Sequence, residues 1–182
     1  NLYGQMLSAR MQELTQQANP PFIQGGSSMG KLVRGYESFS AYALLGKGGV
    51  QLAVDALVQE DERARRFGFS QDELDRARKN MLRNYERAYS ERDKSDSAGF
   101  VAEYSRNFLE QEAIPGIANE LLYAQELLPQ VTLQEINETV AKVIPDQQKK
   151  LVVFMGAEPK AGASVPTQQQ LLDAVAQAER QK

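Results

Sequence analysis

The residues of this sequence that are spaced for paired chemistry, catalysis or cation binding, are acidic. Glu60 and Glu62 lie two residues apart, and a second acidic group follows shortly after them. That second group consists of Asp72, Glu73 and Asp75. Paired carboxylates can serve as a general acid and base, or can supply oxygen ligands to a hard cation. The second group also fits a structural role, because Ser70 and Glu73 have the spacing of a capping box. No Asp-x-Asp-x-Asp-Gly loop is present, so the sequence does not support calcium binding.

The amino-acid composition removes most other chemistry. The 182 residues include no Cys and no His. Without these residue types there is no imidazole base, no thiol nucleophile, no disulfide, and no histidine or thiolate ligand for zinc. The chemistry that remains is that of carboxylates, Lys, Tyr and hydroxyl groups, so the composition points away from most hydrolytic enzymes. With the resemblance described below, we expect no catalytic residue, no metal ligand and no cofactor in this segment. The sequence leaves the substrate-binding residues unknown.

Two further patterns favour ordinary structure over ligand binding. Gly46-Lys47-Gly48-Gly49 lies between a predicted strand and a predicted helix, but it lacks the G-x-x-x-x-G-K-[ST] spacing of a phosphate loop. We interpret it as a flexible turn. The stretch 60–94 interleaves acidic and basic residues, and the whole chain has a net charge of −3. Since nucleic-acid binding needs a surplus of cations, no nucleic-acid partner is expected.

Aromatic side chains recur on the helices predicted in the middle of the chain. They are Tyr85, Tyr89, Phe100, Tyr104 and Phe108. Such a set could line a groove for a peptide, but its helical spacing favours ordinary core packing.

Apolar periodicity and breaker residues give the expected order of elements, α-β-β-α-α-α-α-α-β-α. Strands are expected over 22–33, 36–45 and 151–155, the first two joined by a turn at Arg34-Gly35. The unbroken apolar run Leu151–Met155 predicts a central strand. The first helix, within 1–18, shows no start signal, which suggests that a preceding strand is missing. These elements predict an α+β fold, a two-layer sandwich of a mostly antiparallel sheet with helices on one face.

Four stretches, taken in order, resemble the second domain of insulinase/pitrilysin-family zinc metallopeptidases, above all the long bacterial PqqL-type members. The stretches are Leu7–Leu14 with Asn19–Phe22, Glu60–Ser70 leading to Glu73–Leu74, Arg87–Lys94, and Ile114–Ile117 before Leu127–Leu133. The resemblance covers most of residues 1–155. The resemblance implies the metallopeptidase-repeat fold.

The resemblance also implies where the chemistry of the parent protein lies. In this family, repeated α+β domains enclose a chamber that takes in unfolded peptides. An inverted H-x-x-E-H motif in the first domain holds the zinc, with a further Glu downstream. This sequence has no His, so zinc is expected in the parent and not in this segment. The further Glu also belongs to the first domain, so that role does not transfer to Glu60 or Glu62.

These observations favour a noncatalytic structural domain, part of the chamber wall of a bacterial zinc metalloendopeptidase that degrades peptides or unfolded proteins. The alternative is a freestanding interaction module with the same fold. We expect one α+β domain over 1–156, then a linker and terminal helix over 157–182. The expected partners are the other domains of the parent and its peptide substrates, with self-association of the isolated chain. No membrane span is expected, and the resemblance implies a periplasmic location.

Overall fold

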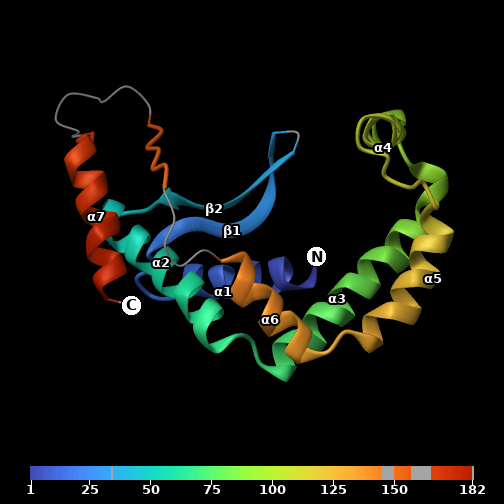
Figure 1. The fold of residues 1–182 in the computed structure, drawn as a ribbon, viewed down its shortest axis with the longest axis horizontal. Coiled ribbons are helices and arrows are strands. Elements are labelled where there is room, and N and C mark those ends of the chain that lie inside the picture. The colour runs from blue at the N-terminus through green and yellow to red at the C-terminus, as the bar shows by residue number, and fades with distance from the viewer. Residues whose placement is uncertain (34, 145–149, 157–164, 182) are drawn as a thin grey trace. The chain divides into compact units, whose positions relative to one another are not determined.

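The structure, a computed structural model, describes residues 1–33, 35–144, 150–156 and 165–181. Two compact units make up the chain. Unit 1 contains Asn1, Tyr3–Phe69 and Gln134–Lys182, and unit 2 contains Leu2 and Ser70–Leu133. The elements, coloured along the chain in Figure 1, are α1 (Leu2–Thr15), β1 (Phe22–Val33), β2 (Tyr36–Leu45), α2 (Gly49–Phe67), α3 (Gln71–Ser90), η1 (Arg92–Lys94), α4 (Ser97–Glu110), α5 (Ile117–Leu127), η2 (Leu128–Gln130), α6 (Leu133–Val143) and α7 (Gln168–Arg180).

An antiparallel hairpin of β1 and β2 forms the sheet of unit 1. Ser27 pairs with Ala41 and Met29 pairs with Phe39, so these four side chains share one face of the ladder. Helix α2 packs against both strands. Gly35 has a φ of 82°, as a tight turn between the strands requires. Its predicted turn partner, Arg34, lies outside the described residues. The strands expected over 22–33 and 36–45 and the α+β class are confirmed.

Helix α1 supplies the largest part of the buried core of unit 1. Met6, Leu7 and Met11 are each at most 2% exposed, and Phe22 at the start of β1 is fully buried. The expectation that this helix has no start signal was wrong. Asn1 caps it, because its side-chain oxygen accepts the Gly4 N–H at 2.9 Å. Asparagine is among the favoured N-cap residues, since its short side chain satisfies one of the free N–H groups of the first turn.

Helix α7 packs against α2, and Figure 1 shows the two side by side. Ala174 and Ala178 are buried on α7, and small side chains at this spacing allow two helices to approach closely. Lys150, directly before Leu151, forms an ion pair with Glu179 of α7. The division into 1–156 and 157–182 stays a prediction.

The expected central strand at Leu151–Met155 was wrong. Among the described residues the sheet has two strands, β1 and β2, and residues 151–155 belong to neither. Leu151 and Met155 are each 89% exposed and Val153 is 65% exposed. An apolar run favours extended backbone, but only hydrogen bonds to neighbouring strands on both sides make it a central strand.

Unit 2 is built around the packing of α3 against α5. Leu74 and Ala77 of α3 and Ala124 of α5 are buried. The capping box predicted at the start of α3 is confirmed, since the Ser70 hydroxyl accepts the Glu73 N–H and the Glu73 carboxylate accepts the Ser70 N–H. Within this unit, the Arg78 guanidinium of α3 also donates to the Val131 carbonyl.

Candidate functional site: the charged end of helix α2

Three consecutive acidic residues near the end of α2 are all buried. Glu60, Asp61 and Glu62 are 8%, 8% and 6% exposed. Successive residues of an α-helix point about 100° apart, so burial of all three means that protein covers more than half of the helix circumference. Buried carboxylates need partners, because an unpaired charge in a low-dielectric interior costs several kcal/mol.

Arginines engage the two outer carboxylates. Arg10 of α1 donates to Glu60 Oε1 at 3.2 Å, and Arg63 approaches Glu60 Oε2 at 3.6 Å. Arg65 donates to both oxygens of Glu62, at 2.7 and 3.0 Å, and Arg66 also donates to this carboxylate. Because both carboxylates are already engaged by guanidinium groups, through hydrogen bonds and ion pairs, Glu60 and Glu62 do not form an acid/base pair or a cation site.

Asp61, between them, has a different environment. Its Oδ2 accepts a hydrogen bond from the Ser27 hydroxyl of β1 at 3.1 Å, and Ser27 is itself only 3% exposed. Oδ1 is buried and has no hydrogen-bond partner in the described part of the chain. Burial, and to a smaller degree the nearby Glu60 charge, raise the pKa of Asp61 to about 7, although the Ser27 hydrogen bond acts to lower it. Asp61 is therefore a buried acid that exchanges its proton near neutrality.

The chain turns sharply where α2 ends, at Gly68 and Phe69. Gly68 has a φ of 67°, and its N–H donates to the Ala64 carbonyl at 2.9 Å. Arg10 Nη2 donates to the Gly68 carbonyl at 2.9 Å. Asn137 of α6 accepts the Phe69 N–H at 2.8 Å and donates to the Phe69 carbonyl at 3.3 Å. Side chains from α1 and α6 thus satisfy the backbone groups of this turn.

The second acidic group lies at the start of α3 and does not form a site. Glu73 belongs to the capping box, and Asp72 lies in the first turn, where a negative charge stabilises the helix dipole. Asp75 accepts from Arg78 at 3.1 Å. Over the described ranges, no three His, Cys, Asp or Glu side chains gather closely enough to hold a metal ion. The donor set found here does not fit a catalytic zinc.

The glycine-rich stretch at 46–49 forms the turn from β2 into α2. The Gly49 N–H donates to the Gly46 carbonyl at 3.4 Å, and Gly49 has a φ of 76°. This is the turn that the sequence predicts. None of the helices described in the structure is long and apolar enough to cross a lipid bilayer.

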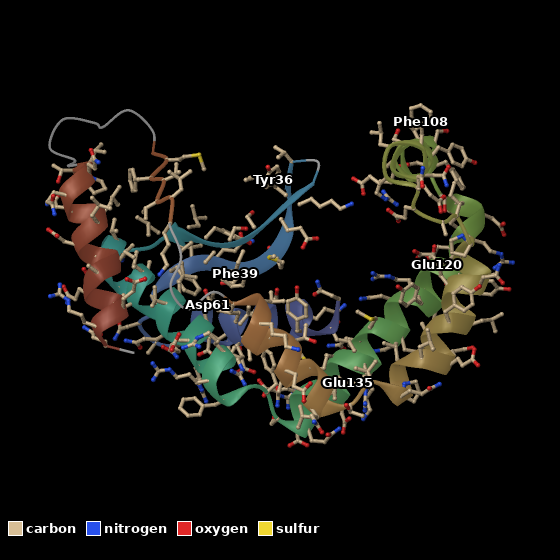
Figure 2. All side chains as sticks on the ribbon, viewed as in Figure 1. Tyr36, Phe39, Asp61, Phe108, Glu120 and Glu135 are labelled. Atoms are coloured by element: carbon tan, nitrogen blue, oxygen red, sulfur yellow. The ribbon has the colours of Figure 1, made fainter. Side chains whose placement is uncertain are left out.

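The interpretation of the aromatic set as core packing was wrong for most of its members. Phe100, Tyr104 and Phe108 of α4 are 45%, 57% and 84% exposed, and Tyr89 is 36% exposed. Tyr85 is half-buried. Figure 2 shows Phe108 on α4, directed away from the helix axis. The Phe100 and Tyr104 rings lie with centroids 6.5 Å apart. Helical spacing identifies one side of a helix, but it does not show whether another element covers that side.

An apolar surface therefore lies on α4, in unit 2. Phe100, Val101, Tyr104, Phe108 and Leu109, which we call the α4 surface, are all at least 45% exposed. Exposed aromatic and aliphatic side chains gathered on one helix are typical of a surface that contacts another protein segment.

Sequence reasoning did not identify Arg10, Ser27 and Asn137, because each acts on a residue far away in the chain. Asp61 counted only as one of the charges in the stretch 60–94. A signal for Asp61 was present, since Ala53, Leu57 and Asp61 are spaced four residues apart and so share one face of the helix. A polar residue on that buried face predicts a partner on the facing element.

Comparisons with known proteins identify the same group of proteases that the sequence motifs resemble. No family model matches this chain. Over 131 residues, 72% of the chain, it is 30% identical to the "Zinc protease PQQL-like" of Arabidopsis thaliana. The matched region spans only 13% of the length of that relative.

Two solved structures from Escherichia coli share the fold. The first half of the periplasmic protease PqqL superposes with a TM-score of 0.70 at 20% identity, covering 78% of this chain and 31% of that one. The structure of PqqL itself superposes with a TM-score of 0.64 at 22% identity, covering 78% and 15% of the two chains. The resemblance that the motifs indicate is confirmed, and the chain is homologous to one segment of a PQQL-like zinc protease.

Proposed function

We propose that this chain is a noncatalytic structural domain of an insulinase-family zinc metallopeptidase and forms part of the wall of its peptide chamber. One observation carries the proposal: the homologous segment is a small part of a zinc protease, yet this sequence has no His with which to bind zinc. The activity on peptides, the zinc and the periplasmic location are proposed for the parent protein. PqqL of E. coli, which shares the fold, is described as a periplasmic protease.

The charged end of α2 supports a structural role. Its carboxylates are engaged by Arg10, Arg65 and Arg66, and its final turn is held by side chains from two other helices. Such an arrangement fixes the positions of α1, α2 and α6 within unit 1 but leaves no carboxylate pair free for hydrolysis. A chamber-wall domain requires this rigidity, because catalytic groups keep their geometry only when the surrounding structure is rigid.

The α4 surface supports a role in contact with the rest of the parent. Its apolar side chains would be covered by another domain of the same protease, which also explains why they remain exposed in this chain alone. An independent interaction module would instead use the same side chains to bind a separate protein.

The coding sequence distinguishes the two functions. An H-x-x-E-H motif encoded in the same polypeptide as this segment is expected for the wall domain. A polypeptide without such a motif would favour the interaction module.

A functional test uses the zinc protease that carries this segment. Substitution of Tyr104→Ser and Phe108→Ser on the α4 surface should leave its zinc content unchanged and reduce its rate of peptide cleavage, because the chamber would no longer close correctly. Ser105→Ala, on the same helix, is the matched control and should cleave like the unchanged protease. A double-serine variant with full activity would contradict the proposed contact.

A further inference from the structure

A buried acid interrupts the apolar face with which α2 contacts the sheet. Ala53 and Leu57 are 1% and 8% exposed, and Asp61 follows at the same four-residue spacing. Figure 2 shows Asp61 on α2, beneath the hairpin that carries Phe39. An apolar residue is the usual occupant of such a position, because an ionised carboxylate there loses its hydration.

The partner that Asp61 does have lies on the sheet. Ser27, on the covered face of β1, donates to Asp61 Oδ2 at 3.1 Å, and both residues are buried. This is a direct polar contact between the strand and the helix, joining positions 34 residues apart in the sequence. The second carboxyl oxygen has no partner in the part of the chain that the structure describes. An ionised Asp61 would therefore be only half satisfied.

The surrounding charges do not offset an ionised Asp61. On α2, Glu60 pairs with Arg10 and Arg63, and Glu62 pairs with Arg65 and Arg66. On the sheet, the charged residues Lys31 and Glu37 are paired with each other across the two strands. Lys31 lies four residues along β1 from Ser27, and Glu37 lies four residues along β2 from Ala41, the partner of Ser27. On α7, Glu179 pairs with Lys150, Arg180 donates to the Ala176 carbonyl, and Asp173 accepts from Gln169.

We propose that the buried contact between β1 and α2 at Ser27 and Asp61 is a proton-dependent latch, which stays closed when Asp61 carries its proton and opens more often when Asp61 is ionised, because the lost hydration of the carboxylate outweighs its stronger hydrogen bond to Ser27. The protonated carboxyl is neutral and fits the buried face of α2. The ionised form places a charge beside the Glu60 carboxylate, with one serine hydroxyl as its hydrogen-bond donor. The contact between strand and helix then opens more often.

The direction of the pH dependence follows from proton linkage. Burial raises the pKa of Asp61 in the closed latch from 3.8 to about 7, whereas an opened latch exposes the acid to water and restores its ordinary pKa. At a pH between these two pKa values, Asp61 is protonated in the closed latch and ionised in the open one. The opening equilibrium therefore rises by up to tenfold per pH unit between about pH 4 and 7 and levels off above that.

Amide hydrogen exchange on the 182-residue chain tests the latch directly. Protection factors of amides in residues 26–28 and 59–63 should fall by more than tenfold between pH 5 and pH 7, after correction for intrinsic exchange. In D61N, which keeps the shape of the side chain but cannot ionise, this fall should disappear. D55N, on the same helix at a half-buried position, is the matched control and should retain it.

NMR titration of the Asp61 side-chain carboxyl gives a second, independent readout that needs no folded D61N. The midpoint should lie near neutrality, and in S27A it should move upward, because the hydrogen bond that favours the ionised form is lost. A midpoint below pH 5 would overturn the proposal. An unchanged midpoint in S27A, or a D61N variant whose protection falls with pH as in the unchanged chain, would overturn it as well.

Discussion

The guanidinium group of Arg10 lies over the ring of Phe69, with its central carbon 4.3 Å from the ring centroid. The same group donates to Glu60 and to the Gly68 carbonyl. One side chain of α1 therefore contacts a charge, a backbone oxygen and an aromatic face at the end of α2. Arginine suits this role because its planar, delocalised cation can stack and donate in several directions at once.

Loss of Arg10 should destabilise unit 1 strongly. R10A removes the partner of a largely buried carboxylate and should lower the free energy of unfolding by about 3 kcal/mol. R10K keeps the charge but loses the stacking and the multiple hydrogen bonds, so it should recover only part of this loss. Urea unfolding of the three proteins measures the difference. If R10K were as stable as the unchanged chain, charge alone would account for the role of Arg10.

Substitution of either of two residues at the turn after α2 should destabilise the chain. G68A places a β-carbon in a backbone conformation with positive φ and against the Asn137 side chain, so we expect a loss of at least about 1 kcal/mol. N137A leaves the backbone groups of Phe69 without their partners and should cost about 1–3 kcal/mol. Thermal unfolding followed by circular dichroism measures both changes. N107A on α4, where the amide donates to an exposed carbonyl, should have a smaller effect.

The free energy of unfolding of the chain should also depend on pH through Asp61. The folded state keeps a proton up to about pH 7 that the unfolded state releases near its ordinary value of 3.8. The resulting stabilisation is complete below about pH 4 and is lost as the pH rises to 7. Relative to D61N, the unchanged chain should lose up to about 1.4 kcal/mol per pH unit between pH 5 and 7. Urea titrations at pH 5, 6 and 7 measure this difference, and parallel curves for the two proteins would contradict it.

The α4 surface should make the isolated chain bind apolar dyes and associate with itself. Phe108, at 84% exposure, is the residue whose replacement should reduce dye binding most. Light scattering over a concentration series and fluorescence of an apolar dye should both respond to Phe108→Ser. A monomeric chain without dye binding would contradict the assignment of this surface as a contact.

Local sequence signals predicted the elements that depend on local physics. The capping box at Ser70 and Glu73, the glycine-rich turn at 46–49 and the hairpin turn at Gly35 all follow from residues close in the chain. Leu151–Met155 could not be predicted this way. Its apolar composition indicates an extended segment, but hydrogen bonding to a neighbouring strand depends on the rest of the fold.

The charged site shows the same limit. The sequence places Glu60 and Glu62 in a stretch of interleaved acidic and basic residues, which does not indicate that they are buried. The structure buries them, because Arg10 comes from another helix and completes the pairing. The sequence indicates only that Asp61 needs a hydrogen-bond partner. It does not identify Ser27 as that partner, because the position of β1 against α2 depends on the folded unit.

The zinc content and peptidase activity of the purified 182-residue chain test the central claim most directly. We predict less than stoichiometric zinc by elemental analysis and no cleavage of unfolded peptides, because the sequence has no histidine and the carboxylates of Glu60 and Glu62 already accept hydrogen bonds from arginines. Tightly held zinc at one ion per chain, together with cleavage that a chelator abolishes, would contradict the assignment of this chain as a noncatalytic domain.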